Sequence, residues 1–277
     1  MVHMRDGHTH TEFCPHGKVE DTELLIKRAI SLGFKEYSIT EHAPLPKGIE
    51  KKAAGDLDVW TTASMALNDV DNYFKRMNEL RKKYASDIII HIGFELDYFS
   101  DFVGWTRDFL AEYGPQTDDG ILSVHFLEGQ DGLRGIDYSF EEYKSGVIDY
   151  LGSFQKAQNL YYQCVLDSLE ADLGPFKPKR LGHISLCQKF ERFFDEETSY
   201  SSENKILVHT LLSRIQQEKY SLDLNTAGFY KQGYQQSYPQ VWITQKAIES
   251  GIPLVYGSDT HALNDVGQGY DKIQHWL

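Results

Sequence analysis

Asp6-Gly7-His8-Thr9-His10 closes the first apolar run of the chain, residues 2–8. In a strand, residues two positions apart point to the same face, so His8 and His10 would lie side by side. That spacing lets one metal ion bind both imidazoles. An H-x-H pair also occurs in proteins without metal, so the evidence must come from the rest of the chain.

Six more short runs rich in Ile, Leu, Val and Tyr follow, and each ends in polar residues. We predict strands at 2–8, 36–40, 88–95, 121–125, 180–184, 221–225 and 253–258. Helical patterns separate them, at 21–32, 67–84, 151–173, 202–219 and 238–250. Gly33 is placed to stop the first helix, and Ser139-Phe140-Glu141-Glu142 matches a capping box that opens a further one.

Strands that alternate with helices predict an α/β fold with a mainly parallel sheet. Seven of them in 277 residues favour one barrel over two domains, so we expect a single domain over residues 1–277. The loop 44–60 is long and carries Gly48 and Gly55, which suggests a lid over a site.

Function in such barrels collects at the carboxyl ends of the strands. Six of the 11 histidines fall at the ends of predicted strands, together with two carboxylates. The set consists of His8, His10, His42, Glu95, His125, His183, Asp259 and His261, with His16 in the loop after the first strand. Imidazole and carboxylate are the usual ligands of zinc, manganese and iron. The joint pattern therefore predicts a metal centre.

The formal net charge of −13 opposes binding to nucleic acids, although bound metal ions could still attract a small anion. Three widely spaced cysteines, Cys14, Cys164 and Cys187, form no disulfide or zinc pattern and indicate reduced thiols in a cytoplasm. The sequence lacks an apolar stretch long enough for a membrane span. We therefore expect a cytoplasmic protein whose oligomeric state the sequence leaves open.

In order, Asp6-Gly7-His8-Thr9-His10, Thr40-Glu41-His42, Glu95, His125, His183 and Asp259-Thr260-His261 resemble the polymerase and histidinol phosphatase (PHP) superfamily. The resemblance covers residues 6 to about 261. Within the superfamily the chain is most similar to the histidinol-phosphate phosphatases of histidine biosynthesis. Three segments support this similarity: 8–17, 123–127 and 222–228.

The resemblance implies a distorted (β/α)7 TIM-like barrel with a trinuclear centre of two to three divalent ions (Zn, Mn or Fe). Carried over by position, the first ion would be held by His8, His10, Glu95 and Asp259. A second ion would share Glu95 and add His125 and His183. The third would be held by His16, His42 and His261.

Two such ions could share a bridging water, lower its pKa and let the hydroxide attack a phosphomonoester. We expect Glu95, Asp259 and His261 to carry the chemistry. Arginine binds phosphate in a bidentate manner, so Arg180, three residues before His183, is the first candidate for substrate binding. Arg134, Arg214 and Asn225 are further candidates.

The expected reaction is hydrolysis of L-histidinol phosphate to L-histidinol and phosphate. Alternative substrates are another small phosphate ester, a nucleotide or a phosphotyrosyl peptide. An amidohydrolase that cleaves C–N bonds also opens with H-x-H, but it typically bridges its metals with a carboxylated Lys, and here Glu95 takes that position. A non-catalytic metal-binding barrel is the remaining alternative.

Overall fold

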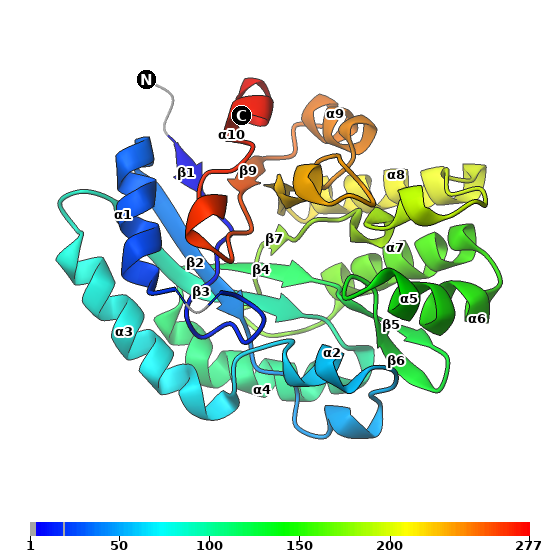
Figure 1. The fold of residues 1–277 in the computed structure, drawn as a ribbon, viewed down its shortest axis with the longest axis horizontal. Coiled ribbons are helices and arrows are strands. Elements are labelled where there is room, and N and C mark those ends of the chain that lie inside the picture. Colours follow the sequence, from blue (N-terminus) through cyan, green and yellow to red (C-terminus); the bar gives the residue numbers. More distant parts are fainter. Residues whose placement is uncertain (1–3, 19) are drawn as a thin grey trace.

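Seven strands meet in one parallel sheet, and the longer ones are buried along almost their whole length. Burial on both faces is the pattern of a parallel sheet covered by helices. In sheet order the strands are β1 Arg5–Asp6, β2 Glu36–His42, β3 Ile89–Asp97, β4 Asp119–Ser123, β7 Arg180–Leu181, β8 Ser221–Asn225 and β9 Leu254–Gly257. This computed structural model describes residues 4–18 and 20–277 (Figure 1).

The first and last strands come together and nearly close the sheet into a barrel. Gly7 N donates to Tyr256 O at 2.7 Å, and Asp259 N donates to His8 O at 2.9 Å. An isolated parallel bridge joins Thr9 to Thr260. The predicted α/β barrel of seven parallel strands is confirmed, and its closure sets the ends of β1 and β9 side by side.

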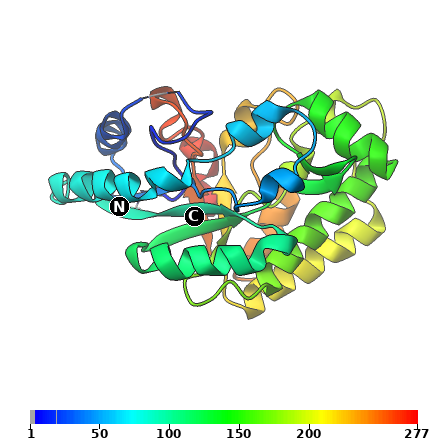
Figure 2. The same cartoon turned by 90° about the horizontal axis from the view of Figure 1, so that it is seen from below.

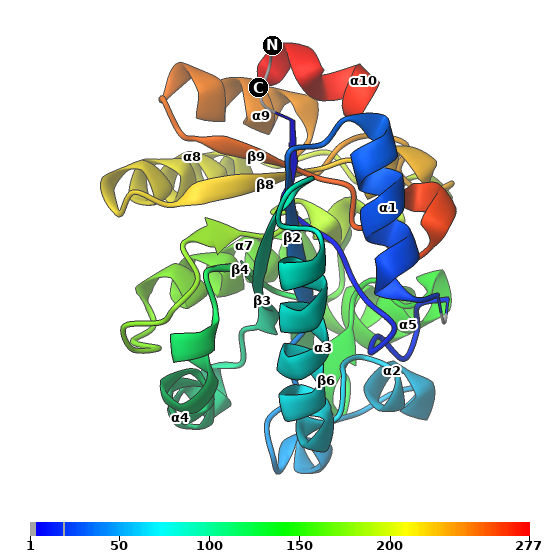
Figure 3. The ribbon, with the colours of Figure 1, turned by 90° about the vertical axis from the view of Figure 1, so that its left-hand side faces the viewer.

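Helices surround the barrel. They are α1 Thr22–Leu32, α2 Leu57–Thr61, α3 Val70–Lys83, α4 Val103–Tyr113, α5 Phe140–Tyr143, α6 Asp149–Leu151, α7 Phe154–Glu170, α8 Ser202–Gln217, α9 Val241–Glu249 and α10 Tyr270–Ile273. Figure 3 shows α1 and α3 side by side, and an ion pair between Lys83 and Glu23 at 2.9 Å ties them together. Figure 2 shows α7 and α8 packed along each other, in yellow-green and yellow.

Alternation along β3 separates core packing from function. The ring of Phe94 points outward, 5.5 Å from the ring of Tyr73 on α3 and 5.3 Å from that of Phe109 on α4. The next residue, Glu95, therefore points into the barrel, where only 1% of it is exposed. The strand thus supplies apolar packing on one face and a buried carboxylate on the other.

Local sequence patterns correctly predict several helix ends. Gly33 adopts the left-handed conformation, with φ +92°, that ends α1. The Ser139 side chain accepts from Glu142 N at the start of α5, as the capping box predicted. The helix predicted from 151 begins at Phe154 instead, because Gly152, at φ +85°, ends α6 first.

Besides short helices such as α2 and α10, two elements were not predicted. One is α4, which buries Thr106, Phe109 and Leu110 but has no side-chain cap at its start. The other is the antiparallel hairpin of β5 Phe126–Gly129 and β6 Gly132–Gly135, which directly follows His125. The strand predicted at 2–8 is reduced to Arg5–Asp6, and its residues 2 and 3 lie outside the described residues.

The segment 44–60, predicted as a loop, contains a short 3-10 helix, Ile49–Lys51, and most of α2. It is fastened to the hairpin, since Ala54 N donates to Leu133 O at 3.0 Å and Leu133 N donates to Lys52 O at 2.8 Å. Its Val59 lines the cavity described below. That it opens and closes as a lid stays a prediction. No helix among the described residues is long and apolar enough to cross a membrane.

Candidate metal centre

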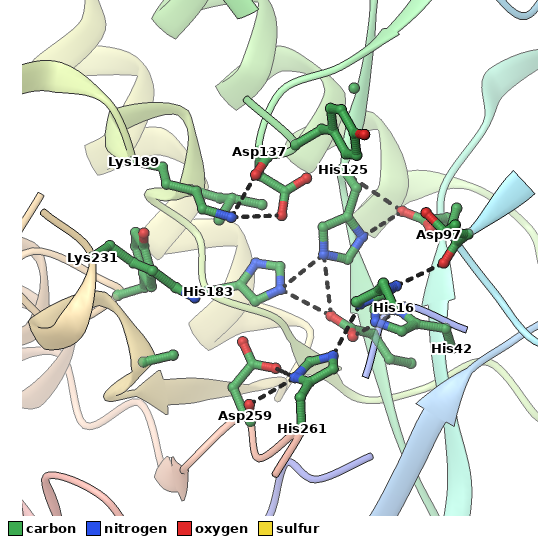
Figure 4. A pocket seen from close by; sticks show the side chains of 18 of the residues that line it. His16, His42, Asp97, His125, Asp137, His183, Lys189, Lys231, Asp259 and His261 are labelled. Atoms are coloured by element: carbon green, nitrogen blue, oxygen red, sulfur yellow. Dashed lines mark hydrogen bonds and ion pairs between the residues drawn. The ribbon is translucent and has the colours of Figure 1, made fainter. Parts of the chain in front are cut away.

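The carboxyl ends of the barrel strands open onto one cavity of about 460 Å³. Figure 4 shows imidazoles and carboxylates converging on its floor. The ionisable and imidazole side chains that line it are His16, His42, Glu95, Asp97, His125, Asp137, His183, Lys189, Lys231, Asp259, His261 and Asp265. Elements far apart in the sequence thus contribute to a single site.

One group of donor atoms surrounds a single oxygen of Glu95. Oε2 of Glu95 lies 3.2 Å from His8 Nε2 and 3.6 Å from His10 Nε2. Oδ1 of Asp259 completes the group, 3.2 Å from His10 Nε2 and 3.7 Å from His8 Nε2. The H-x-H pair therefore directs both imidazoles to the same point, as alternation predicts.

A second group surrounds the other oxygen of Glu95. Oε1 lies 2.9 Å from His183 Nε2 and 3.5 Å from His125 Nε2. Those two imidazole nitrogens are 3.2 Å apart. Oε2 also lies 3.2 Å from His42 Nδ1. Because the two oxygens of Glu95 face different histidines, its carboxylate has the geometry needed to bridge two ions.

A third group lies toward the rim. His16 Nε2 and His261 Nε2 are 3.0 Å apart, and the ring of His42 lies 4.9 Å from that of His16. His16 is exposed, whereas His42 is buried. The donor atoms of Cys14, His10, His42 and His261 also lie within 4.8 Å of one another, a proximity of Cys14 that the sequence did not suggest.

The arrangement fits metal ions better than hydrogen bonding. His16 and His261 each donate through Nδ1 to a backbone carbonyl, so in their neutral forms both Nε2 atoms carry lone pairs, and these face each other at 3.0 Å. The buried Nε2 of His10 and both ring nitrogens of His42 make no well-aligned hydrogen bond, although Asp259 Oδ1 lies 3.2 Å from His10 Nε2 and Glu95 Oε2 lies 3.2 Å from His42 Nδ1. Buried polar atoms are normally satisfied, so these unpaired donor atoms indicate places for cations. The three groups fit divalent metal ions in their chemistry and spacing.

A second layer of acceptors fixes most of the imidazoles through Nδ1. Nδ1 of His8 lies 2.8 Å from Asp223 Oδ2, and that of His125 lies 2.8 Å from Asp97 Oδ1. For His10 the partner is Glu41 Oε1 at 3.2 Å. Backbone carbonyls serve the other two: Asp259 O for His261 and Thr62 O for His16. With Nδ1 occupied, Nε2 is left to face the centre.

Sequence reasoning missed these carboxylates, although a signal existed. Asp97 lies two residues after Glu95 and therefore on the same face of β3. Glu41 stands inside the quoted motif Thr40-Glu41-His42, and Asp223 lies two residues before Asn225 on β8. Alternation applied to the strand ends would have found two of the three.

Burial and neighbouring charges set the proton affinities in the centre. Burial alone would raise the pKa of Glu95, but His8, His125 and His42 outweigh it and hold that pKa well below its usual range. Burial, followed by the charge of His10, lowers the pKa of His42 well below its ordinary value. The same two causes lower the pKa of His261. Against the effect of burial, neighbouring carboxylates raise the pKa of His10 to about 9 and that of His125 to about 10, so these imidazoles must release a proton when they bind metal in the neutral form.

The predicted substrate-binding arginines do not line this cavity. Arg180 is buried and donates through Nη2 to Gly7 O at 2.7 Å and Asp119 Oδ2 at 2.8 Å. Arg134 forms a bidentate pair with Glu142 at 2.6 and 2.9 Å. Each guanidinium already has a structural partner.

Arg214 and Asn225 also have protein partners. Arg214 pairs with Glu170 at 3.2 Å on the outside of the barrel. Asn225 is fully buried, and its Nδ2 donates to Asp259 Oδ2 at 3.1 Å and Asp223 Oδ2 at 3.2 Å. Asn225 thus holds the carboxylates of the centre in place. The cations that do reach the cavity are Lys189 and Lys231, in irregular segments without a sequence signal.

Comparison with known proteins decides the family, since the PHP domain pattern matches residues 6–227. The chain belongs to the PHP domain family. All the proposed ligands except Asp259 and His261 fall inside the matched PHP region.

Several PHP proteins are similar over nearly the full length. A histidinol-phosphatase of Bacillus subtilis is 37% identical over 269 residues, which are 97% of both chains. A Listeria monocytogenes protein whose structure carries a provisional histidinol phosphatase name shares 54% identity, with a TM-score of 0.95 over 97% of this chain and 99% of that one. The Lactococcus lactis histidinol phosphate phosphatase, solved with zinc, L-histidinol and phosphate, is 19% identical with a TM-score of 0.69, over 99% of this chain and 93% of that one. That last likeness shows the PHP fold alone.

Proposed function

We propose that this PHP domain hydrolyses L-histidinol phosphate to L-histidinol and inorganic phosphate, a step of histidine biosynthesis. Full-length similarity to the B. subtilis histidinol-phosphatase, at 37% identity, supports the reaction and the substrate. The high structural similarity to the L. monocytogenes protein points the same way. The enzyme is accordingly a phosphoric monoester hydrolase.

The proposal rests chiefly on the carboxylate of Glu95, whose two oxygens face different histidines. Its Oε2 faces the buried His8 and His10 while its Oε1 faces His125 and His183, which line the cavity together with Glu95. A carboxylate shared between two imidazole groups could hold two ions close enough for two-metal phosphoryl transfer. A purely structural role would leave the buried nitrogens of His10 and His42 without a well-aligned hydrogen bond.

We assign the ligands to three ions of zinc, manganese or iron. His8, His10, Glu95 and Asp259 would hold the first ion. Glu95, His125 and His183 would hold the second. His16, His42 and His261 would hold the third. When bound, the ions supply positive charge for the phosphoryl oxygens and an activated water.

Residues next to the proposed ligands hold these ligands in position. Asp97, Asp223 and Glu41 hold imidazoles with Nε2 facing inward. Asp259 lines the cavity, and Asn225 fixes its Oδ2. We therefore assign Asp259 Oδ1 to the first ion site, where it faces His8 and His10. Together with Glu95 and His261 it forms the proposed catalytic set.

Steady-state hydrolysis of a panel of phosphomonoesters tests the proposal. The metal-loaded protein should hydrolyse histidinol phosphate with a kcat/KM at least 100 times (order of magnitude) that for a nucleotide, a sugar phosphate or phosphotyrosine, since specificity is a ratio of these constants. Equal values across the panel would refute the substrate assignment. No hydrolysis of any ester would favour a non-catalytic metal-binding barrel.

A further inference from the structure

The charged wall of the cavity above the ligands contains two lysines of different character. Lys189 is tied down, because its Nζ donates to Asp137 O at 2.6 Å and to Asp137 Oδ2 at 3.1 Å. Its side chain is 15% exposed. Lys189 therefore acts as a fixed positive charge beside the site.

Among the described residues, Lys231 has no partner comparable to that of Lys189. It follows the 3-10 turn Ala227–Tyr230 after β8 and is exposed at the rim. Within residues 4–18 and 20–277, its ammonium forms no ion pair or hydrogen bond, and Asp259, Asp137 and Asp265 act on it only through their charge. Figure 4 shows its side chain reaching into the cavity toward His183.

The charges around Lys231 describe a place for an anion. The nearby charge of Lys189 is the main cause that lowers the pKa of Lys231, and burial adds to it. Asp259, Asp137 and Asp265 act in the opposite direction without cancelling the effect. Two ammonium groups that repel each other across a cavity would both be stabilised by a dianion between them.

We propose that Lys231 binds the phosphoryl group of the substrate at the mouth of the metal centre, with Lys189, held by Asp137, as the second positive charge. The inference rests on the proposed phosphatase function. A phosphomonoester is a dianion near neutral pH, and an ammonium offers it three donors in a compact charge. The arginines that would ordinarily fill this role are engaged elsewhere.

Inorganic phosphate titrated calorimetrically into zinc-loaded protein tests the proposal without turnover. Lys231→Met should weaken phosphate binding by about tenfold or more, the range of a charge-assisted contact. Lys231→Arg should stay within about threefold of the unsubstituted protein, because it keeps the charge. The matched control is Lys272→Met, since Lys272 lies 4.7 Å from the ring centroids of both Phe229 and Tyr230 and does not line the cavity.

Kinetics give a second readout. The KM for histidinol phosphate should rise in Lys231→Met by the factor seen for phosphate, with a smaller change in kcat, because a ground-state contact is removed. Elemental analysis must show unchanged ion content, which separates substrate binding from damage to the centre. Phosphate affinity within twofold of the unsubstituted protein, or equal losses in the Met and Arg variants, would overturn the role of Lys231. If the unsubstituted protein prefers another ester, the substrate assignment fails while the phosphate titration still tests Lys231.

Discussion

Glu95 presents its two oxygens to different groups of imidazoles, and its environment favours the ionised form of this buried carboxylate. Ser123 Oγ donates to its Oε1 at 2.7 Å, and His183 Nε2 lies 2.9 Å from the same atom. Neighbouring imidazoles hold its pKa low although burial opposes ionisation. A neutral amide at this position would keep the shape of the side chain and lose the charge that two cations share.

Glu95→Gln should therefore abolish hydrolysis, by about 1000-fold or more, and remove two ions together rather than one. The loss follows because a bridging ligand serves both sites. Elemental analysis after reconstitution provides the measurement. Glu128→Gln, on the exposed face of the hairpin, is the matched control and should keep full ion content. Loss of a single ion would argue against bridging.

Asp223 is one of the acceptors that hold the imidazoles through Nδ1, and its single hydrogen bond can be removed by substitution. Its Oδ2 lies 2.8 Å from His8 Nδ1, and the side chain is fully buried. Asp223→Asn should lower metal affinity by about 10–100-fold, because the imidazole loses the charge that raises its basicity. Competition with a chelator measures the affinity. Unchanged affinity in this variant would mean that His8 is held by packing alone.

At the scale of elements, periodicity predicts the parts of the barrel that repeat. The alternation of β3 and the stop at Gly33 are local properties, so residue order is enough to find them. The hairpin after His125 could not be predicted in this way, because β5 and β6 are short and pair outside the barrel sheet.

The residues of the candidate centre likewise include some that the sequence predicts and others that it does not. Ligands at strand ends are predictable, since parallel strands bring their carboxyl ends to one edge. The partners of the arginines are not, because they depend on contacts between elements: Arg180 reaches Asp119 on β4, and Arg134 reaches Glu142 on α5. Lys231 enters the cavity from an irregular turn for which no periodicity exists.

Arg134 has a structural role, because its ion pair with Glu142 joins the β5–β6 hairpin to α5. Its pair with Glu142 is largely buried, with side-chain exposures of 11% and 7%. Arg134→Met should lower the free energy of unfolding by about 3 kcal/mol, because it leaves a buried carboxylate unpaired. Urea denaturation measures this change. The double variant Arg134→Met/Glu142→Met should recover much of the loss, and KM should stay within twofold; a large KM increase would restore Arg134 as a substrate-binding residue.

At the scale of the whole molecule, the barrel joins distant segments into one stable unit, and a half-buried carboxylate away from the centre gives that stability a pH dependence. Glu191 accepts hydrogen bonds from Gln188, Gln236 and Gln240, but burial raises its pKa to about 7. The unfolded chain releases this proton near its ordinary value of 4.5, whereas the folded protein retains it until about 7. The stabilisation is therefore full below pH 4.5 and is lost as pH rises toward 7.

Glu191→Gln should be relatively more stable at pH 8 than at pH 4.5, by about 1–2 kcal/mol after allowance for partial exposure. Urea unfolding of both proteins at the two pH values checks the sign. A difference that does not change with pH would show that Glu191 titrates normally.

We propose that nine side chains at the barrel ends hold metal ions on both sides of Glu95. Anomalous diffraction at the zinc edge, from crystals of the zinc-loaded protein, would locate these ions. Two peaks should flank the Glu95 carboxylate, one beside His8 and His10 and the other beside His125 and His183. A third peak should lie among His16, His42 and His261. A single peak at Glu95, or none, would refute the proposed metal centre.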